Sequence, residues 1–487
     1  MTYANQAASN ERPPQISRRR VLAMAVGWSA PVLGISLAEG AEKPARRRGV
    51  LARNPELETL GTRTKIVLEL DGEVQVQEPK ADAKEELRTS KVRGKSTLQY
   101  TEQIALAKAQ PIASQRRYSI ARTENWVSGS SSSFELRSEC RDTVMLRPKS
   151  RWKQYCPSET LTHREIELVD SPINSACLEL LLPEDPARPN QPWDLPAEHA
   201  AEIFNLHAVH KSTITSRVTK VEDGKATIEL QGAIDGTVHS VPTHIDVQGS
   251  YQVTLAESGA LVSWLALMLK EKRTVGAFEP GFEIAAKVRL IREERDAKSE
   301  THDRLVELAG EDDEGRWLIS IASPRGGYTM LADRRWKMYT DGGEEAILRM
   351  VENNVVIAQC NVMYLTPLNE GQQLTLEGLQ ADIRAELGDS FQQFLESGEK
   401  KVGDGLRLLR VVAMGNREEV PIQWVYSHLS DDSGKRLIMV YTMGGNVTDR
   451  FAASDEQMSS SFRFIEKQTS EPKAAPQLTQ GETNPKR

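Results

Sequence analysis

Hydrophobic and polar residues alternate along much of the first half of the chain. The clearest stretches are residues 66–70, 226–230 and 251–255. Alternation with a period of two is typical of β-strands that bury one face and expose the other to water. Turn residues such as Glu222-Asp223-Gly224-Lys225 separate the stretches. The pattern predicts an antiparallel β-meander, folded as a half-barrel or a sandwich, over residues 62–294.

Two segments interrupt or vary this alternation. Five prolines between residues 183 and 196 exclude regular structure there, and a short helix is expected at Ala197–Leu206. The most apolar short stretch of this half is Trp264–Leu269. We interpret it as a strand buried on both faces, or as one that borders a cavity on the concave side of a half-barrel.

The second half mixes strand and helix patterns. Strands are expected at 318–322, 336–339, 355–365, 406–414, 422–428 and 437–443. Thr375 is a suitable N-cap for a helix whose apolar positions recur at helical spacing as far as Phe391. A closing helix is expected over 449–462. This order predicts a smaller α/β/α sandwich over residues 316–466, so the fold class of the whole chain is α+β.

Polar segments flank both predicted domains. Residues 41–61 and the highly charged stretch 295–315 are interpreted as linkers, and the proline-containing residues 467–487 as a disordered tail.

The N-terminus carries an export pattern. A basic Arg18-Arg19-Arg20 precedes an apolar run that extends to Ala38, and small residues allow cleavage after Ala38 or Gly40. The pattern predicts a signal peptide over residues 1–40 and a periplasmic or otherwise extracytoplasmic location. An uncleaved signal that anchors the chain is the alternative, and it would be the only membrane contact expected.

Three resemblances go with these patterns. Ser17-Arg18-Arg19-Arg20-Val21-Leu22 resembles the twin-arginine motif of bacterial export, with Val21 where that family prefers Phe. The order of elements over 316–466 resembles the PsbP-like family, which includes DcrB-type periplasmic proteins, and this resemblance implies a binding or assembly module without a catalytic motif. The predicted meander is similar to the half-barrels of LolA-like lipoprotein and lipid carriers.

Composition limits the classes of partner. A net charge of −7 gives no global field for nucleic acid, and the basic clusters are confined to the N-terminus. Cys140, Cys156 and Cys177 lie in one stretch, so an oxidising compartment would allow a Cys140–Cys156 or a Cys156–Cys177 disulfide. Small buried thiols are the alternative, and the spacing of the cysteines is unlike that of a zinc site.

Histidines supply the remaining candidate chemistry. His207 and His210 could ligate a metal from one helix face, with His199 upstream, although exposed histidines at a helix end are the plainer interpretation. His244 and Asp246 share one face of a predicted strand, close to His239. The sequence has neither a G-x-S-x-G elbow nor a phosphate-binding glycine motif, and no cofactor is expected.

These observations favour a non-enzymatic binding or scaffold protein of the bacterial envelope. Its expected partner is a lipophilic small molecule or another envelope protein, held on the concave face of the first domain. Two alternatives remain open at this point. One is a metal-dependent hydrolase that uses His207 and His210, and the other is a purely structural envelope protein without a small ligand.

Overall fold

The computed structural model describes residues 51–78, 86–148, 151–187, 191–256, 259–276, 279–369 and 371–466. The predicted signal peptide, residues 41–50 of the first predicted linker and the predicted tail lie outside these residues. Among the described residues, no helix combines the length and the apolar content needed to cross a membrane.

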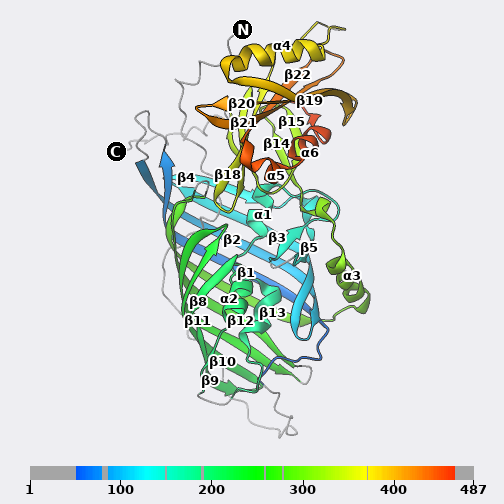
Figure 1. The fold of residues 1–487 in the computed structure, drawn as a ribbon. Helices are drawn as coiled ribbons and strands as arrows, with labels where there is room; N and C mark the ends of the chain where they lie inside the picture. Colours follow the sequence, from blue (N-terminus) through cyan, green and yellow to red (C-terminus); the bar gives the residue numbers. More distant parts are fainter. Residues whose placement is uncertain are drawn as a thin grey trace, which may run out of the picture.

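A large antiparallel sheet forms the first part of the described chain (Figure 1). Its long strands are β1 (Thr59–Glu78), β2 (Glu86–Ala107), β3 (Gln110–Val127), β10 (Lys225–Val238), β11 (Val241–Ala256), β12 (Gly259–Arg273) and β13 (Gly281–Arg295). Shorter strands are β4 (Ser130–Glu135), β5 (Asp142–Leu146), β6 (Lys153–Tyr155), β7 (Trp193–Asp194), β8 (Ala208–Ser212) and β9 (Thr215–Glu222). The order is β6-β5-β3-β2-β1-β13-β12-β11-β10-β9-β7, so the first and last long strands meet in the middle.

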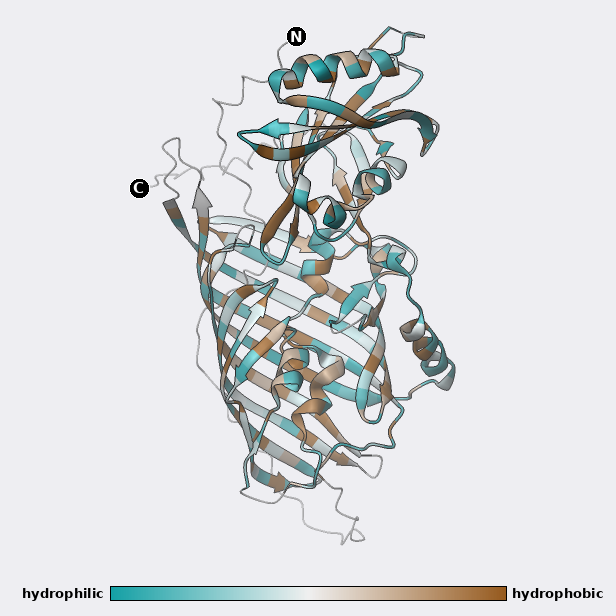
Figure 2. Cartoon of the chain, in the orientation of Figure 1, coloured by the Kyte–Doolittle hydropathy of each residue, from teal (hydrophilic) through white to brown (hydrophobic). Residues whose placement is uncertain are grey.

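The two faces of this sheet differ in polarity, as the alternating bands of Figure 2 show. Ile66, Leu68 and Leu70 are buried on what we call the inner face. The outer face carries cross-strand ion pairs such as Lys95 with Glu69, at 3.5 Å. The alternation of hydrophobic and polar residues in this half therefore correctly predicted a sheet with one buried and one solvent-exposed face.

Residues between β4 and β8 cover the inner face. They form η1 (Ser138–Cys140), α1 (His163–Val169), η2 (Ser175–Leu181) and α2 (Ala197–Ile203), around which the sheet curves (Figure 1). Leu178, Leu181 and Phe204 from this inserted segment belong to the same hydrophobic core as the inner-face side chains. The expected helix at Ala197–Leu206 is confirmed in a shorter form, and the described residues of the proline-rich segment before it include the two-residue strand β7.

Of the two interpretations of Trp264–Leu269, burial on both faces was wrong. Leu265, Leu267 and Leu269 are buried on the inner face, whereas Trp264 and Met268 are only half-buried on the outer face. These five residues lie in one regular strand, so alternate side chains point to opposite sides.

Two further antiparallel sheets follow. A three-stranded sheet contains β14 (Ile319–Ser323), β15 (Tyr328–Ala332) and β23 (Arg463–Phe464). A seven-stranded sheet contains β16 (Trp336–Asp341), β17 (Glu345–Glu352), β18 (Val355–Tyr364), β19 (Phe391–Val402), β20 (Leu406–Arg417), β21 (Val420–Ser430) and β22 (Arg436–Gly444). Their helices are α4 (Leu376–Leu387), α5 (Thr448–Phe451) and α6 (Ser454–Ser460).

Helix α4 covers one face of the seven-stranded sheet. The three-stranded sheet and helices α5 and α6 pack against the opposite face. Leu379 and Ile383 of α4 pack with Trp424 and Tyr426 of β21. Phe451 and Met458 belong to the core on the other side. The chain as a whole is rich in open antiparallel sheet with fewer helices, which is consistent with the α+β class predicted from the sequence.

Three boundaries differ from the sequence prediction. The helix that begins after Thr375 ends at Leu387 rather than near Phe391, because Gly388 takes a φ of 51° and Phe391 starts strand β19. The expected closing helix is divided into α5 and α6 by Ala452, which also has a φ of 51°. The predicted linker 295–315 contains helix α3 (Ser299–Gly310), whose Leu305 is buried.

Helix α1 connects the large sheet to the later sheets. Ile166 packs against the cores of both regions. Nε2 of His163 donates to the carbonyl oxygen of Trp336 at 2.6 Å, and Ser320 N–H donates to the carbonyl of Leu161 at 3.0 Å. Arg334 donates to the carbonyl of Gln154 at 2.6 Å. These contacts place α1 beside the space described next.

Candidate functional site

A cleft of about 600 Å³, lined by both charged and apolar side chains, lies between the inserted segment and the later sheets. Its lining residues come from five parts of the chain: 116–174, 205–207, 239–279, 314–317 and 333–354. We call this space the cleft. Its volume is within the range of about 300–1,000 Å³ that is typical of small-molecule sites.

Two tight hairpins form part of the cleft's lining. His239 and Ser240 join β10 to β11, and Asn353 and Asn354 join β17 to β18. All four residues have positive φ angles between 50° and 63°, as a two-residue type I′ hairpin requires. Ser240 Oγ donates to Asn353 Oδ1 at 3.3 Å, so the two hairpins touch and hold this side of the cleft.

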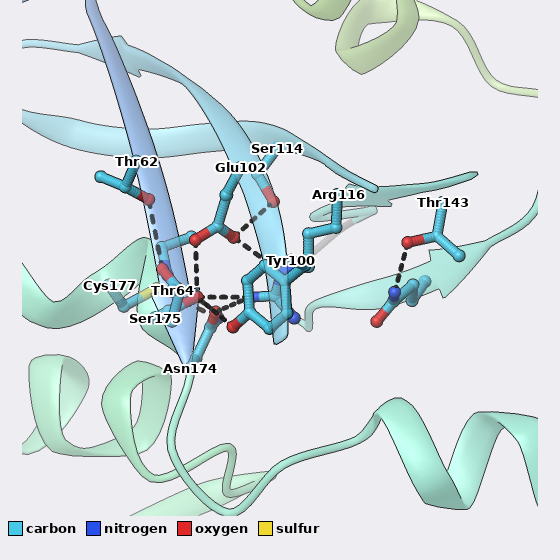
Figure 3. Close-up of polar contacts among 12 residues, drawn as sticks. Thr62, Thr64, Tyr100, Glu102, Ser114, Arg116, Thr143, Asn174, Ser175 and Cys177 are labelled. Carbon is cyan, nitrogen blue, oxygen red and sulfur yellow. Dashed lines mark hydrogen bonds and ion pairs between the residues drawn. The ribbon is translucent and has the colours of Figure 1, made fainter. Parts of the chain in front are cut away.

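A buried ion pair joins β2 and β3 beside the cleft (Figure 3). Glu102 of β2 and Arg116 of β3 are 0% and 3% exposed, and Arg116 Nε donates to Glu102 Oε1 at 2.6 Å. Nη2 of Arg116 donates to Asn174 Oδ1 at 3.1 Å and to Ser175 Oγ at 3.0 Å. Arg116 and Asn174 also line the cleft. The guanidinium is therefore fixed in orientation before any ligand arrives.

Further hydrogen bonds saturate the carboxylate of Glu102. Ser175 Oγ donates to its Oε2 at 2.6 Å, and Ser114 Oγ donates to its Oε1 at 3.2 Å. The hydroxyl of Tyr100 lies 2.8 Å from Ser175 Oγ, and burial raises the pKa of that phenol well above its ordinary value. A buried charged network with this many partners is rigid, because breaking any one bond leaves a polar group without solvent.

The structure does not bring together the histidines that the sequence suggested as metal ligands. His199 is buried in α2, where burial lowers its pKa, while His210 is exposed on β8. His207 instead meets His239, with ring centroids 4.4 Å apart. No group of three or more His, Cys, Asp or Glu side chains suited to a metal occurs among the described residues.

The geometry of His207 also argues against metal ligation. The backbone N–H of His239 donates to Nδ1 of His207 at 3.1 Å, so the lone pair of Nδ1 is not available to a metal ion. In a neutral imidazole the other nitrogen then carries the proton and acts as a donor. Oε1 of Glu279 lies 3.4 Å from Nδ1 of His239. The pair therefore presents hydrogen-bonding groups to the cleft rather than a vacant metal site.

The other predicted polar pair lies away from the cleft. His244 and Asp246 share the outer face of β11, as expected, with His244 Nε2 3.3 Å from Asp246 Oδ1. A hydrogen bond with Asp235 and a second with Asp246 raise the pKa of His244. Both side chains are exposed, so the pair lies on the solvent-facing side of the sheet.

The four cysteines are free, buried thiols, and the structure holds neither of the disulfides considered from the sequence. Cys156 Sγ lies 3.4 Å from the carbonyl oxygen of Glu139, next to Cys140 in the chain. Burial raises the pKa of the Cys140 thiol to about 12. A thiol with so high a pKa remains protonated and is a poor nucleophile.

A second, smaller space lies on the inner face of the large sheet. This cavity of about 100 Å³ has an aliphatic floor made by Leu70, Leu269 and Ile284, and Leu168 and Phe204 of the inserted segment also line it. We call it the apolar cavity after this floor, although polar side chains such as Asn125 and Arg164 line it as well. Leu269 belongs to the apolar stretch that the sequence placed beside a cavity. The volume is less than that of a typical ligand site, because the inserted segment fills most of the inner face.

The sequence carries a signal for the buried ion pair, namely a glutamate at a position where the strand is otherwise apolar. In β2, Leu98, Tyr100 and Ile104 occupy inner-face positions, and Glu102 falls at the same parity. A carboxylate on an otherwise apolar face requires a partner inside the fold. Which residue supplies it depends on the pairing of β2 with β3, which places Arg116 opposite Glu102.

No family model and no curated protein matches the chain. Similar solved structures include cyanobacterial PsbP (CyanoP) from Synechocystis sp. PCC 6803, at 16% identity over 32% of this chain and 98% of that chain, with a TM-score of 0.24. A Bacteroides thetaiotaomicron protein is 11% identical over 30% of this chain, with a TM-score of 0.23, and lipovitellin is 9% identical over 50%, with a TM-score of 0.28. The chain spans 48% of the Bacteroides protein and 26% of lipovitellin.

Proposed function

We propose that this protein is a non-enzymatic, extracytoplasmic binding protein of the bacterial envelope whose ligand occupies the cleft. The observation that carries the proposal is the cleft itself, which has a volume of about 600 Å³ and is lined by Arg116, whose guanidinium is held by hydrogen bonds. Ligand sites are commonly found where separately folded layers meet. The PsbP-like order of the later elements supports a binding or assembly role for that part, and the Arg18-Arg19 pattern supports export.

Native mass spectrometry of the protein, purified gently from a host that exports it, tests the binding proposal. We expect a population with additional mass that corresponds to a small organic ligand. Val351 lines the cleft from β17, so Val351→Trp should reduce that population by blocking the space. Val420→Trp is the matched control, because Val420 is 52% exposed on another strand of the same sheet and does not line the cleft.

The mass of the purified protein distinguishes the binding protein from the two alternative functions. A bare polypeptide mass in repeated preparations would contradict the binding proposal and favour a purely structural protein. Additional mass equal to a divalent metal ion would revive the metal-dependent hydrolase. Equal ligand occupancy in Val351→Trp and the wild type would place the ligand elsewhere.

Export is tested separately. Substitution of Arg18 and Arg19 by Lys keeps the positive charge but removes the guanidinium pair of the motif. We expect the doubly substituted protein to accumulate in the cytoplasmic fraction, while wild type is recovered outside the cytoplasm. Equal distribution of both proteins would contradict a twin-arginine signal.

A further inference from the structure

We propose that the ligand is an amphiphile, with a polar head in the cleft and a single apolar chain that enters the apolar cavity. This inference rests on the function proposed above and adds the chemical class of the ligand. It follows from the positions of the two spaces relative to each other, and from the difference in their linings.

The cleft and the apolar cavity share a wall. Glu167, Asp170, Ser171 and Asn205 line both spaces. One layer of residues therefore separates them. Three of the four residues lie outside regular helix or strand, since α1 ends at Val169 and α2 at Ile203.

A side-chain hydrogen bond joins two parts of this wall. Nδ2 of Asn205 donates to Oδ1 of Asp170, and Asn205 has a φ of 51°. The contact links the end of α1 to the end of α2, so the wall between the two spaces is built partly from side chains rather than from a strand of the large sheet.

The two linings differ in charge. The cavity has an aliphatic floor from β1, β12 and β13, and among the described residues four charged side chains line it, Arg164, Glu167, Asp170 and Glu271. Among the described residues, the cleft is lined by six Lys or Arg and six Asp or Glu side chains. A purely apolar ligand would desolvate these charges without replacing their hydrogen bonds, and a purely polar one would leave the apolar cavity unused. A molecule with both parts matches both linings.

The experiment compares lysophosphatidylcholine with a twelve-carbon acyl chain to its headgroup alone, glycerophosphocholine. Its zwitterionic head suits the even balance of charges in the cleft. Each methylene removed from water strengthens binding about fourfold, so three buried methylenes would give roughly a 50-fold preference for the lysolipid. Isothermal titration calorimetry of the full chain measures both affinities.

Two variants in strand β13 test whether the acyl chain of the lysolipid enters the apolar cavity. Ala286 lines the cavity between Leu70 and Leu269, and Ala286→Phe should fill it. Ala285 is the next residue, half-buried on the outer face opposite Asp71, so Ala285→Phe is the matched control. We expect Ala286→Phe to weaken lysolipid binding at least tenfold, with unchanged headgroup binding, and Ala285→Phe to change neither.

If Ala286→Phe still binds the headgroup as the wild type does, the variant is folded. If headgroup binding is lost, the smaller substitution Ala286→Leu is used in place of Ala286→Phe. Equal affinity for lysolipid and headgroup, or equal lysolipid binding by the Ala286 variant and wild type, would overturn the amphiphile inference while leaving the binding proposal intact. If neither probe binds and native mass spectrometry shows a bare polypeptide, the proposed function itself fails.

Discussion

The buried pair of Glu102 and Arg116 allows a sharp test of what holds the large sheet against the inserted segment. Glu102→Gln keeps the size of the side chain but removes its charge, so the guanidinium of Arg116 stays 3% exposed without its counter-ion. Breaking one partner of such a buried pair costs about 3–5 kcal/mol, because the remaining charge is not solvated. Removing both charges by Glu102→Met with Arg116→Met should cost clearly less than the single change.

Urea unfolding followed by tryptophan fluorescence measures these differences in the free energy of unfolding. The control is Arg117→Met, one residue further along β3. Arg117 points to the outer face, where its side chain is 72% exposed and pairs with Asp142 at 2.7 Å. An exposed pair contributes less than about 1 kcal/mol. The reasoning would be refuted if Glu102→Gln cost no more than Arg117→Met, or if the double change cost more than Glu102→Gln.

Three further predictions follow from particular contacts. Burial, together with the charges of Arg436 and Arg407, lowers the pKa of His428 from 6.5 to about 4. As the pH falls, the unfolded chain therefore takes up a proton before the folded chain does, and about 3 kcal/mol of stability should be lost between about pH 6.5 and pH 4. Urea unfolding of His428→Leu should lack this part of the pH dependence. An unchanged dependence of stability on pH in the variant would contradict the assignment to His428. A Cβ at Gly249 would lie 2.1 Å from the carbonyl oxygen of Ala266, so Gly249→Ala should cost about 1–3 kcal/mol in the same assay, whereas Ser250→Ala on the outer face should be nearly neutral. Thr375 Oγ1 accepts from Gly378 N–H at 3.0 Å, and its replacement by Ala should cost about 1 kcal/mol, while Thr375→Ser should retain most of the cap.

The sequence predicted the large features well where the physics is local. Alternation at 66–70 reports which side chains of a strand face the core, and the structure buries Ile66, Leu68 and Leu70. The N-cap at Thr375 depends on a hydrogen bond only three residues away, and it is present. The extension of α4 to Phe391 failed because apolar residues at helical spacing do not reveal that Gly388 takes a positive φ.

The candidate site was mostly beyond the reach of the sequence. The histidines were chosen because they are close in the chain, yet His207 meets His239, 32 residues away, through the hairpin of β10 and β11. The same holds for Glu102 and Asn174, which reach one guanidinium from separate elements. Spacing along a chain indicates a shared site only when one helix or strand carries all the residues.

The sequence by itself therefore predicted many of the strands and helices and the buried and exposed faces of the large sheet, because each depends on residues within a few positions of one another. Only the tertiary structure decided that the inserted segment fills the inner face, that the cleft lies beside α1, and that one layer of residues separates it from an apolar cavity. These features arise where segments more than a hundred residues apart come together, and no local pattern records which of the many available pairings buries the most surface at the least cost in unsatisfied polar groups.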